Sequence, residues 1–336
     1  MKLIVNGHAN IGTSWGTRRY MTGVLNNLHW PDTVEMSVVK RSSGMRRRLE
    51  DHLQPGSKDT LFWTPLHRGP LFAHNHVVTV LDCINIEYPP RGKLALPLVW
   101  SLFAKLLSNA RAIVPISKAT EAAILRNFPV DASKIRTIAG PATIDEAVLG
   151  AAPLTVPAAN VDRPFILMVT NSLPHKNTAA ACEAFAASAA CRAGMILRIV
   201  GSVDERARAA LAAPGVASEI RQGVDDSTLA DWYQNCVFLL SPSLAEGLNL
   251  PIAEALSRGS NVLCSDIDVH REFYDGQVRF FDPLRKDAMV SAIDDAIDSE
   301  GRWPRHANAA FKRSFADVGA EYRALFLEIA TERGNR

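Results

Sequence analysis

The chain has 336 residues, of which 47% are hydrophobic and 21% charged, and its formal net charge is +2. This length exceeds the usual size of one hydrophobic core, so we expect two domains, and because no run of about 18 apolar residues is present we expect no membrane-spanning helix. The five cysteines are widely spaced and form no CxxC pair, which argues against a disulfide framework or a zinc site and favours the reducing cytoplasm.

Charge is divided unevenly along the chain. Residues 1–150 hold 18 Lys and Arg against 11 Asp and Glu, whereas the rest of the chain holds 19 against 24. The basic excess includes Arg41 and the run Arg46, Arg47 and Arg48. It predicts either an anionic partner, such as the inner face of the cell membrane or a lipid-phosphate acceptor, or a solvated basic loop. Nucleic acid is not expected as a partner.

Short apolar runs of strand length recur along the chain, and most end in Ser, Asn, Asp or Gly, as strands do where they turn into loops. In chain order they are LIVN, HVVTVLD, AIVPIS, FILMV, MILRIVG, VFLLSPS and NVLCSD. Segments with helical periodicity alternate with them, at 97–109, 178–190, 226–235, 251–258 and 317–333. This pattern predicts an α/β fold with parallel sheets, which bind ligands at the carboxyl ends of their strands.

The stretch 151–164, AAPLTVPAANVDRP, is rich in Ala and Pro and has neither helical nor strand periodicity. Such a composition is typical of an interdomain linker. We therefore predict an N-terminal domain at 1–153 and a C-terminal domain at 160–312.

The helix expected at 97–109 is mostly apolar, with Trp100, Phe103, Leu106 and Leu107 at helical intervals and Leu102 widening the apolar face. A buried helix explains this pattern. A helix that dips into one membrane leaflet is the alternative.

The most informative stretch is 241–265, which runs from a strand end through a loop into a short helix and reads SPSLAEGLNLPIAEALSRGSNVLCS. Pro251 suits the first helical position, and Gly259 suits the left-handed residue just after the helix. The helix N-terminus would then face the loop that carries Glu246, and its free backbone N–H groups and positive dipole end would attract a diphosphate. Glu254, one turn inside, can accept hydrogen bonds from both hydroxyls of a ribose, and Glu246 can hold hydroxyls of a sugar.

Residues 246–255 resemble, with changes, the E-G-F-G-L-P-x-x-E-A signature of family 4 of the retaining GT-B glycosyltransferases. The resemblance covers most of the chain, more closely in its second half. It implies the α/β GT-B fold, in which two Rossmann-like parallel-sheet domains face a central cleft and the last helix, at about 315–336, packs back on the first domain. It also implies that Glu254 binds the nucleotide ribose and that Glu246 contacts the donor sugar near the reacting centre. By the same resemblance the four residues that follow Glu246 would line the donor site, and they are Gly247, Leu248, Asn249 and Leu250.

Asn249 stands where this family usually has its second Gly. Asn is among the non-glycine residues that adopt a positive φ most readily. We therefore expect the turn to be retained, and the Asn249 amide to lie near the phosphates.

The stretch 170–177, TNSLPHKN, follows the strand FILMV and resembles the donor-phosphate loop of the family. By that resemblance Lys176 would neutralise the leaving diphosphate, although a surface lysine in a loop is the alternative. Asn171 occupies a position where many members have an Arg, and His175 replaces the Arg of P-R-K-N. A protonated His175 could supply part of the missing charge.

Two further segments of the first half resemble the family more weakly. Residues 12–20, GTSWGTRRY, resemble the glycine-rich loop that approaches the donor phosphates and the acceptor. Gly16 is the candidate for close approach, and Arg18 or Arg19 is a candidate contact to phosphate or acceptor. An ordinary surface turn explains this segment about as well.

The strand VVTVLD resembles one that normally ends in His-Asp, with the histidine beside the transferred sugar. Leu81 stands in place of that histidine, while Asp82 is retained and is a candidate for the sugar pocket. Ser117 matches the serine at the end of another strand of the family and is a candidate for donor binding.

No metal ion and no cofactor is expected. Asp266 and Asp268 form a DxD pair, which is the metal motif of another glycosyltransferase fold, but the context of that fold is missing around them. Lys176 and the helix beginning near Pro251 would take the place of a metal at the diphosphate.

The resemblance therefore implies a retaining, metal-independent hexosyltransferase. The donor would be a nucleotide-diphosphate sugar, GDP-mannose-like or UDP-hexose, and the acceptor a glycan or a lipid-linked sugar in bacterial surface polysaccharide synthesis. One alternative, supported by Leu81 and Asn171, is a weak or inactive nucleotide-sugar-binding protein that partners an active transferase. A second alternative is a GT-B epimerase, but no acid/base residues for one are identifiable. A dinucleotide oxidoreductase is disfavoured because no GxGxxG motif follows any strand.

Overall fold

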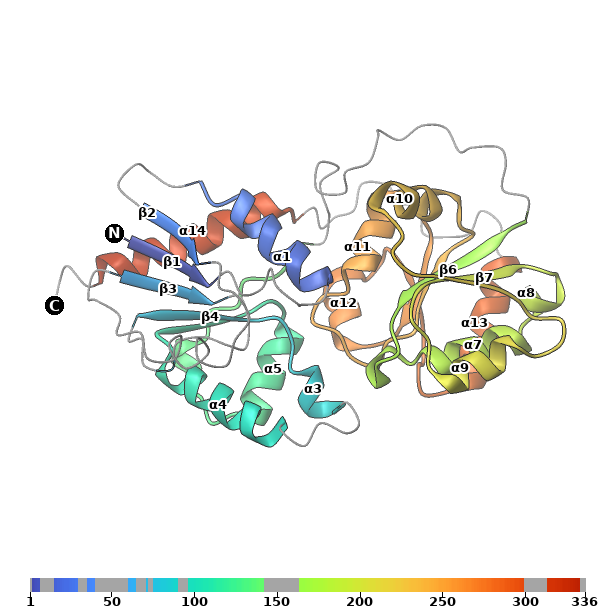
Figure 1. The fold of residues 1–336 in the computed structure, drawn as a ribbon, viewed down its shortest axis with the longest axis horizontal. Helices are drawn as coiled ribbons and strands as arrows, with labels where there is room; N and C mark the ends of the chain where they lie inside the picture. The colour runs from blue at the N-terminus through green and yellow to red at the C-terminus, as the bar shows by residue number, and fades with distance from the viewer. Residues whose placement is uncertain are drawn as a thin grey trace. The chain divides into compact units, whose positions relative to one another are not determined.

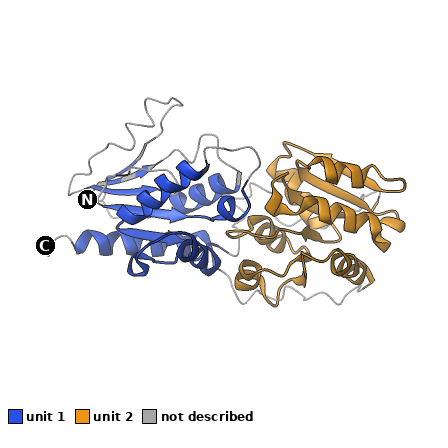
Figure 2. Ribbon diagram, turned by 90° about the horizontal axis from the view of Figure 1, so that it is seen from below, with its two compact units in different colours: residues 1–141, 313–336 blue, residues 142–312 orange. Residues whose placement is uncertain are grey.

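The computed structural model describes residues 2–6, 15–29, 35–39, 60–64, 71, 75–89, 96–141, 163–298 and 313–332. The basic run around Arg46, residues 12–14 of the expected glycine-rich loop, and 151–162 of the expected linker lie outside these ranges. The chain divides into two compact units, Met1–Pro141 with Arg313–Arg336 and Ala142–Lys312 (Figure 2).

Each unit is built on one sheet whose strand pairs are all parallel. The first sheet has the order β2-β1-β3-β4-β5 and the second β11-β10-β9-β6-β7-β8. The strands are β1 (Lys2–Asn6), β2 (Glu35–Val39), β3 (Thr60–Thr64), β4 (His76–Val80), β5 (Ala112–Pro115), β6 (Phe165–Thr170), β7 (Ile196–Gly201), β8 (Ala217–Arg221), β9 (Leu239–Ser241), β10 (Val262–Ser265) and β11 (Arg279–Phe281).

Helices connect these strands, as parallel pairing requires. Those of the first unit are α1 (Trp15–Asn26), α3 (Ile84–Glu87), α4 (Leu96–Asn109), α5 (Lys118–Asn127), the 3-10 turn η2 (Ala132–Lys134) and α14 (Phe315–Thr331). Those of the second are the 3-10 turn η3 (Pro174–Lys176), α7 (Thr178–Ala187), α8 (Ala189–Arg192), α9 (Glu205–Leu211), α10 (Asp226–Asn235), α11 (Leu250–Ser257), α12 (Asp268–Tyr274) and α13 (Lys286–Asp298).

In the first unit the two faces of the sheet are covered by different helices (Figure 1). Val78 and Val80 of β4 belong to a buried cluster with Phe103 of α4 and Ile124 of α5. Thr79 points to the opposite face, where its hydroxyl lies 2.7 Å from the Tyr322 hydroxyl of α14. The alternation of side chains along a strand thus places α4 and α5 on one face and α14 on the other.

The C-terminal helix α14 therefore belongs to the first unit although the second unit precedes it in the chain. Its N-terminus is fixed by a capping box in which Ser314 and Asp317 bond reciprocally. It crosses α1 closely at two glycines. A Cβ atom added to Gly23 would lie 2.5 Å from the Phe315 ring, and one added to Gly319 would lie 2.5 Å from the Asn27 carbonyl oxygen.

In the second unit one face of the sheet carries α7, α9 and α13. A buried cluster joins Ile166 and Met168 of β6 to Phe185 of α7 and Ile293 of α13. Arg198 of β7 lies on the other face and stacks on Phe165 and on Trp232 of α10, with 4.0 and 4.5 Å from its guanidinium carbon to the ring centres.

The structure confirms the α/β fold with two parallel sheets. Each expected helix is present, with α10 at 226–235 as predicted, α11 one residue earlier than predicted and α14 at 315–331. The helix expected at 178–190 is instead two helices, because the Ser188 side chain accepts a hydrogen bond from the Cys191 N–H and begins α8. Four strands, β2, β3, β8 and β11, were not predicted.

The helix α4 buries Phe103, Leu106 and Leu107, while Leu98 and Leu102 on its other side are 65% and 40% exposed. A buried helix accounts for the first three residues. Insertion of α4 into a membrane leaflet remains a prediction. No helix in the described ranges combines the length and the apolar character needed to cross a bilayer.

Candidate functional site

The candidate site lies in the second unit, at the carboxyl ends of two neighbouring strands. β6 ends at Thr170 and β9 ends at Ser241, and each continues into a loop that the sequence singles out. The loops are tied together, because the Leu244 N–H donates to the His175 carbonyl oxygen at 2.7 Å. Parallel α/β sheets bind their ligands at this edge.

The two loops bring Lys176 and Glu246 into an ion pair, with 2.6 Å between Nζ and Oε1. Both side chains are largely buried, at 16% and 8% exposed. Burial raises the pKa of Glu246, but the Lys176 ammonium, helped by the Ser243 hydroxyl and by His175, outweighs it, and the pKa lies below its ordinary value. Glu246 is therefore an ionised carboxylate at neutral pH, held beside a cation.

The helix α11 begins four residues after Glu246. Its first residue is Leu250, and Gly259 follows its end with φ of 74°, as predicted for a left-handed residue after the helix. Asn249 is the N-cap with φ of 68° and ψ of 65°, which confirms the prediction that Asn keeps the turn in which the family usually has Gly.

The Asn249 side chain is held inside the protein, and the nearness of its amide to the phosphates stays a prediction. Asn249 is 6% exposed, and its Nδ2 lies 2.8 Å from Ser241 Oγ and 2.9 Å from His270 Nε2. The backbone around it is held as well, since the Tyr274 hydroxyl donates to the Leu248 and Asn249 carbonyl oxygens at 3.0 and 3.2 Å.

Glu254 lies inside α11 and is fully buried, at 0% exposed. The Tyr233 hydroxyl of α10 donates to its Oε2 at 2.9 Å. A ribose can reach this carboxylate only if the structure around it rearranges, so the contact between Glu254 and a ribose stays a prediction.

The other loop residues nominated from the sequence hold the two loops in shape. Leu248 and Leu250 are 4% and 7% exposed, so their side chains anchor the loop in the core, and Gly247 between Glu246 and Leu248 is buried. Asn171 uses its Oδ1 to accept the Leu173 N–H at 2.9 Å, which closes a turn at the start of the loop.

The first unit contains the remaining nominated residues. Gly16, Arg18 and Arg19 lie in α1, so this part of the expected glycine-rich loop is helix, and Arg19 is only 8% exposed. The loop interpretation was wrong for residues 15–20 because the run YMTGVLNN that follows packs as an amphipathic helix and extends the helix back to Trp15.

Asp82 and Ser117 follow β4 and β5, which are neighbours in the first sheet. Asp82 Oδ1 accepts the Ile84 N–H at 3.1 Å, and Ser117 caps α5 by accepting the Thr120 N–H at 3.0 Å. The Thr120 hydroxyl donates in turn to the Leu81 carbonyl oxygen at 3.2 Å. Leu81 itself is 8% exposed and lies in the core.

Sequence reasoning missed Tyr233, which bonds Glu254 in α11, and His270 and Tyr274, which bond the loop before α11. They come from α10 and α12, and no motif marks them. The pairing of Asn249 with His270 spans 21 residues, so only the fold reveals it.

No cluster of three or more metal-binding side chains occurs among the described residues. The DxD pair is partly engaged, because Arg271 binds both Asp266 oxygens, with Nε and Nη2 at 2.7 and 2.8 Å.

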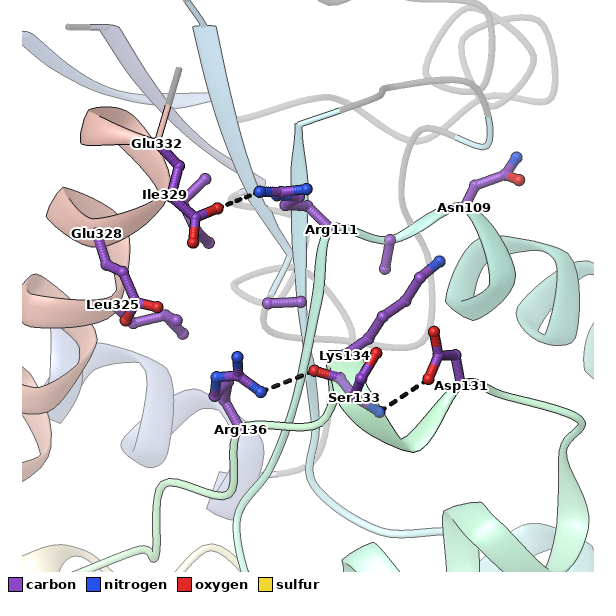
Figure 3. Close-up of a pocket in the computed structure, with 12 residues that line it drawn as sticks. Asn109, Arg111, Asp131, Ser133, Lys134, Arg136, Leu325, Glu328, Ile329 and Glu332 are labelled. Atoms are coloured by element: carbon purple, nitrogen blue, oxygen red, sulfur yellow. Dashed lines mark hydrogen bonds and ion pairs between the residues drawn. The ribbon is translucent and has the colours of Figure 1, made fainter. Parts of the chain in front are cut away.

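A surface pocket of about 460 Å³ lies in the first unit, near the beginning of β5 and the last turns of α14 (Figure 3). Both of its arginines are engaged, Arg111 with Glu332 and Arg136 with the Ser133 carbonyl oxygen at 2.8 Å. None of the residues nominated from the sequence lines it. Its position at the amino ends of the strands also sets it apart from the ligand-binding edge.

Residues 155–313 match the family model described as glycosyl transferases group 1. No curated protein sequence matches the chain.

Solved structures resemble the chain over almost its whole length. A sucrose-phosphate synthase from Thermosynechococcus elongatus has a TM-score of 0.62 at 17% identity, covering 99% of this chain and 97% of its own. WaaG, a glycosyltransferase involved in lipopolysaccharide biosynthesis, has 0.62 at 13% identity, covering 99% and 98%. HepE from Anabaena, in complex with UDP and glucose, has 0.61 at 11% identity, covering 99% and 98%. The chain therefore has the GT-B fold.

Proposed function

We propose that this chain is a retaining glycosyltransferase that moves a hexose from a nucleotide-diphosphate sugar to an acceptor, as the match of residues 155–313 to the glycosyl transferases group 1 model supports. The reaction would need no metal ion. The donor would be GDP-mannose-like or UDP-hexose.

The ion pair of Lys176 with Glu246 beside the start of α11 carries this proposal. A departing diphosphate develops negative charge, which a lysine and a helix N-terminus stabilise. Glu246 is ionised and accepts hydrogen bonds, so it suits sugar hydroxyls next to that diphosphate. One compact loop cluster thus offers a group for each half of a nucleotide-sugar.

No side chain placed as a protein nucleophile is required by this mechanism. The departing phosphate would take the acceptor proton as it leaves from the same face, and the protein would contribute position and charge. For Lys176 to serve the diphosphate, it would exchange its bond to Glu246 for one to a phosphate oxygen.

The proposal names only the class of acceptor. WaaG is described as involved in lipopolysaccharide biosynthesis, and by that analogy we propose a glycan or lipid-linked acceptor in bacterial surface polysaccharide synthesis. A cytoplasmic protein in peripheral contact with the membrane fits the basic excess of residues 1–150.

A second candidate function is nucleotide-sugar binding without transfer, in partnership with an active enzyme. Two observations favour it. Leu81 occupies the position of the family's histidine and is buried in the core. Asn171 occupies the position where many members have a cationic Arg, and its side chain instead closes a turn of its own loop.

A panel of nucleotide-sugars, read by thermal shift with released UDP or GDP assayed alongside, tests the proposal. We expect one donor to raise the melting temperature and to be turned over, slowly by water and faster with an acceptor. Glu246→Gln should abolish turnover, whereas Glu205→Gln, at an exposed position in α9, should leave it unchanged. Stabilisation by a donor with no turnover under any condition would favour the binding protein, and no response to any nucleotide would refute both candidates.

A further inference from the structure

A series of hydrogen-bonded, buried polar groups connects α12 to the last residue before α11. His270 Nδ1 lies 2.8 Å from the Ser265 carbonyl oxygen, and His270 Nε2 lies 2.9 Å from Asn249 Nδ2. Asn249 Nδ2 also lies 2.8 Å from Ser241 Oγ. His270 and Ser265 are 0% exposed, and Asn249 is 6% exposed.

These contacts fix the form of the imidazole. A carbonyl oxygen only accepts, so Nδ1 carries the proton, and Nε2 is left as an acceptor for the Asn249 amide. Burial lowers the pKa of His270 to about 4, with Lys176 acting in the same direction, against the Ser265 carbonyl, Glu246 and Asp266, which raise it. The ring is therefore neutral at neutral pH, as the acceptor role of Nε2 requires.

The side chain of Asn249 does not cap α11, just as that of Asn177 does not cap α7. An Asn at this position ordinarily uses its side chain to accept an N–H of the first turn, as Asp204, Asp225 and Ser314 do at the starts of α9, α10 and α14. Asn249 makes no such bond, because its side chain is directed to His270 and Ser241. In this first turn Pro251 has no N–H, and the Ile252 N–H donates to the Asn249 carbonyl oxygen at 3.0 Å, so the backbone of Asn249, and not its side chain, begins α11.

The backbone of Asn249 also needs support. In the part of the chain that the structure describes, Asn249 and Asn177 are the non-glycine residues with positive φ, and they precede α11 and α7. A left-handed residue with a side chain is tolerated where its surroundings hold it. At Asn249 these surroundings are the ring of His270 and the hydroxyl of Ser241.

We propose that His270 is a positioning residue of the donor site, which holds the Asn249 amide and with it the left-handed turn that joins the Glu246 loop to α11. This inference rests on the proposed function. His270 touches neither substrate nor the reacting atoms and acts through Asn249.

A double-mutant cycle on the full chain tests the inference, with UDP and GDP as probes and their dissociation constants as the readout. His270→Phe keeps a ring but removes the acceptor, and Asn249→Gly keeps the left-handed backbone but removes the amide. We expect His270→Phe to weaken nucleotide binding about tenfold in the natural background and by less than twofold in the Asn249→Gly background. Equal losses in both backgrounds would mean that His270 acts through core packing, and would overturn the inference.

His270→Gln is run in parallel, because it keeps an amide oxygen as an acceptor and serves if His270→Phe does not fold. Affinity within threefold of the unsubstituted chain supports the inference, and an equal loss in both backgrounds overturns it. His76→Leu is the matched control, since His76 is also buried, at 1% exposed, and hydrogen-bonded to Thr64 in the first unit. It should lower the melting temperature and leave nucleotide affinity unchanged.

The outcomes distinguish a failure of this inference from a failure of the proposed function. Nucleotide binding by the unsubstituted chain with an additive cycle would overturn the role of His270 alone. Absence of binding by the unsubstituted chain would overturn the proposed function and the role of His270 with it.

Discussion

The ion pair between Lys176 and Glu246 determines how a single substitution should affect the candidate site. The pKa of Glu246 lies below its ordinary value, so the ionised carboxylate stabilises the fold above the unfolded pKa of about 4.3, and this contribution is lost as the pH falls. Lys176→Met removes the cation and leaves the burial, so the pKa of Glu246 should rise above its ordinary value. We expect a loss of about 2 kcal/mol at pH 7.5 that becomes smaller at pH 5, measured by urea unfolding at both pH values.

Lys105→Met is the matched control, because Lys105 is exposed on α4. It should change the free energy of unfolding by less than about 0.5 kcal/mol at either pH. A Lys176→Met protein that loses the same stability at both pH values would show that Lys176 contributes packing rather than charge to Glu246.

Single residues also mark the limit of sequence reasoning. Lys176 and Glu246 could be nominated because each lies in a short motif after a strand, and because parallel strands end at a common edge. Their direct contact across 70 residues, and that of Asn249 with His270, depend on which strands and helices are neighbours. Local patterns carry no such information.

Among the elements, prediction succeeded where an apolar run is bounded by turn residues. Three of the four missed strands, β2, β8 and β11, lie at the margins of the sheets, whereas the fourth, β3, is central and fully buried. β8 is an edge strand with no fully buried side chain, and β11 is an edge strand of only three residues. Neither has the buried run by which central parallel strands are recognised. The helix at 178–190 was predicted as one piece because a serine inside a helical pattern does not reveal whether its side chain begins a new helix.

The ends of the elements give a prediction through two glycines of the second unit. Gly201 ends β7 with φ of 122°, and a Cβ there would lie 1.9 Å from the Thr170 carbonyl oxygen, at the start of the Lys176 loop. Gly259 follows α11 with φ of 74°, and nothing lies within 4 Å of its Cβ position. Gly259→Ala should therefore cost about 1 kcal/mol from backbone strain alone and leave nucleotide affinity unchanged.

Gly201→Ala should cost more, about 3 kcal/mol, and should also weaken UDP or GDP binding, because Thr170 must shift and the loop with Lys176 shifts with it. Urea unfolding and isothermal calorimetry on both variants check the pair. Equal stability losses would show that the backbone conformation, and not the approach to Thr170, is what requires glycine at position 201.

At the scale of the whole molecule, the chain completes its first unit only with its last helix. α14 covers one face of the first sheet, where Trp63, Tyr322 and Phe326 stack with ring centres 5.1 to 5.7 Å apart. The Tyr322 hydroxyl also reaches Thr79, which receives the Trp63 indole N–H at 2.9 Å. The stability of the first unit therefore depends on residues that follow the second unit in the chain.

Gly319 allows this arrangement because α14 crosses α1 there, with a Cβ position 2.5 Å from the Asn27 carbonyl oxygen. Gly319→Val should force the two helices apart and destabilise the first unit by about 3 kcal/mol, whereas Ala320→Val, at an exposed position on the same helix, should cost less than about 1 kcal/mol. Hydrogen exchange read by mass spectrometry localises the effect, and we expect faster exchange in α1, α14 and β3 with unchanged protection in α7 and α11. Faster exchange throughout the chain would instead mean that the two units unfold as one cooperative body, because damage to the first would then propagate to the helix that carries the candidate donor site.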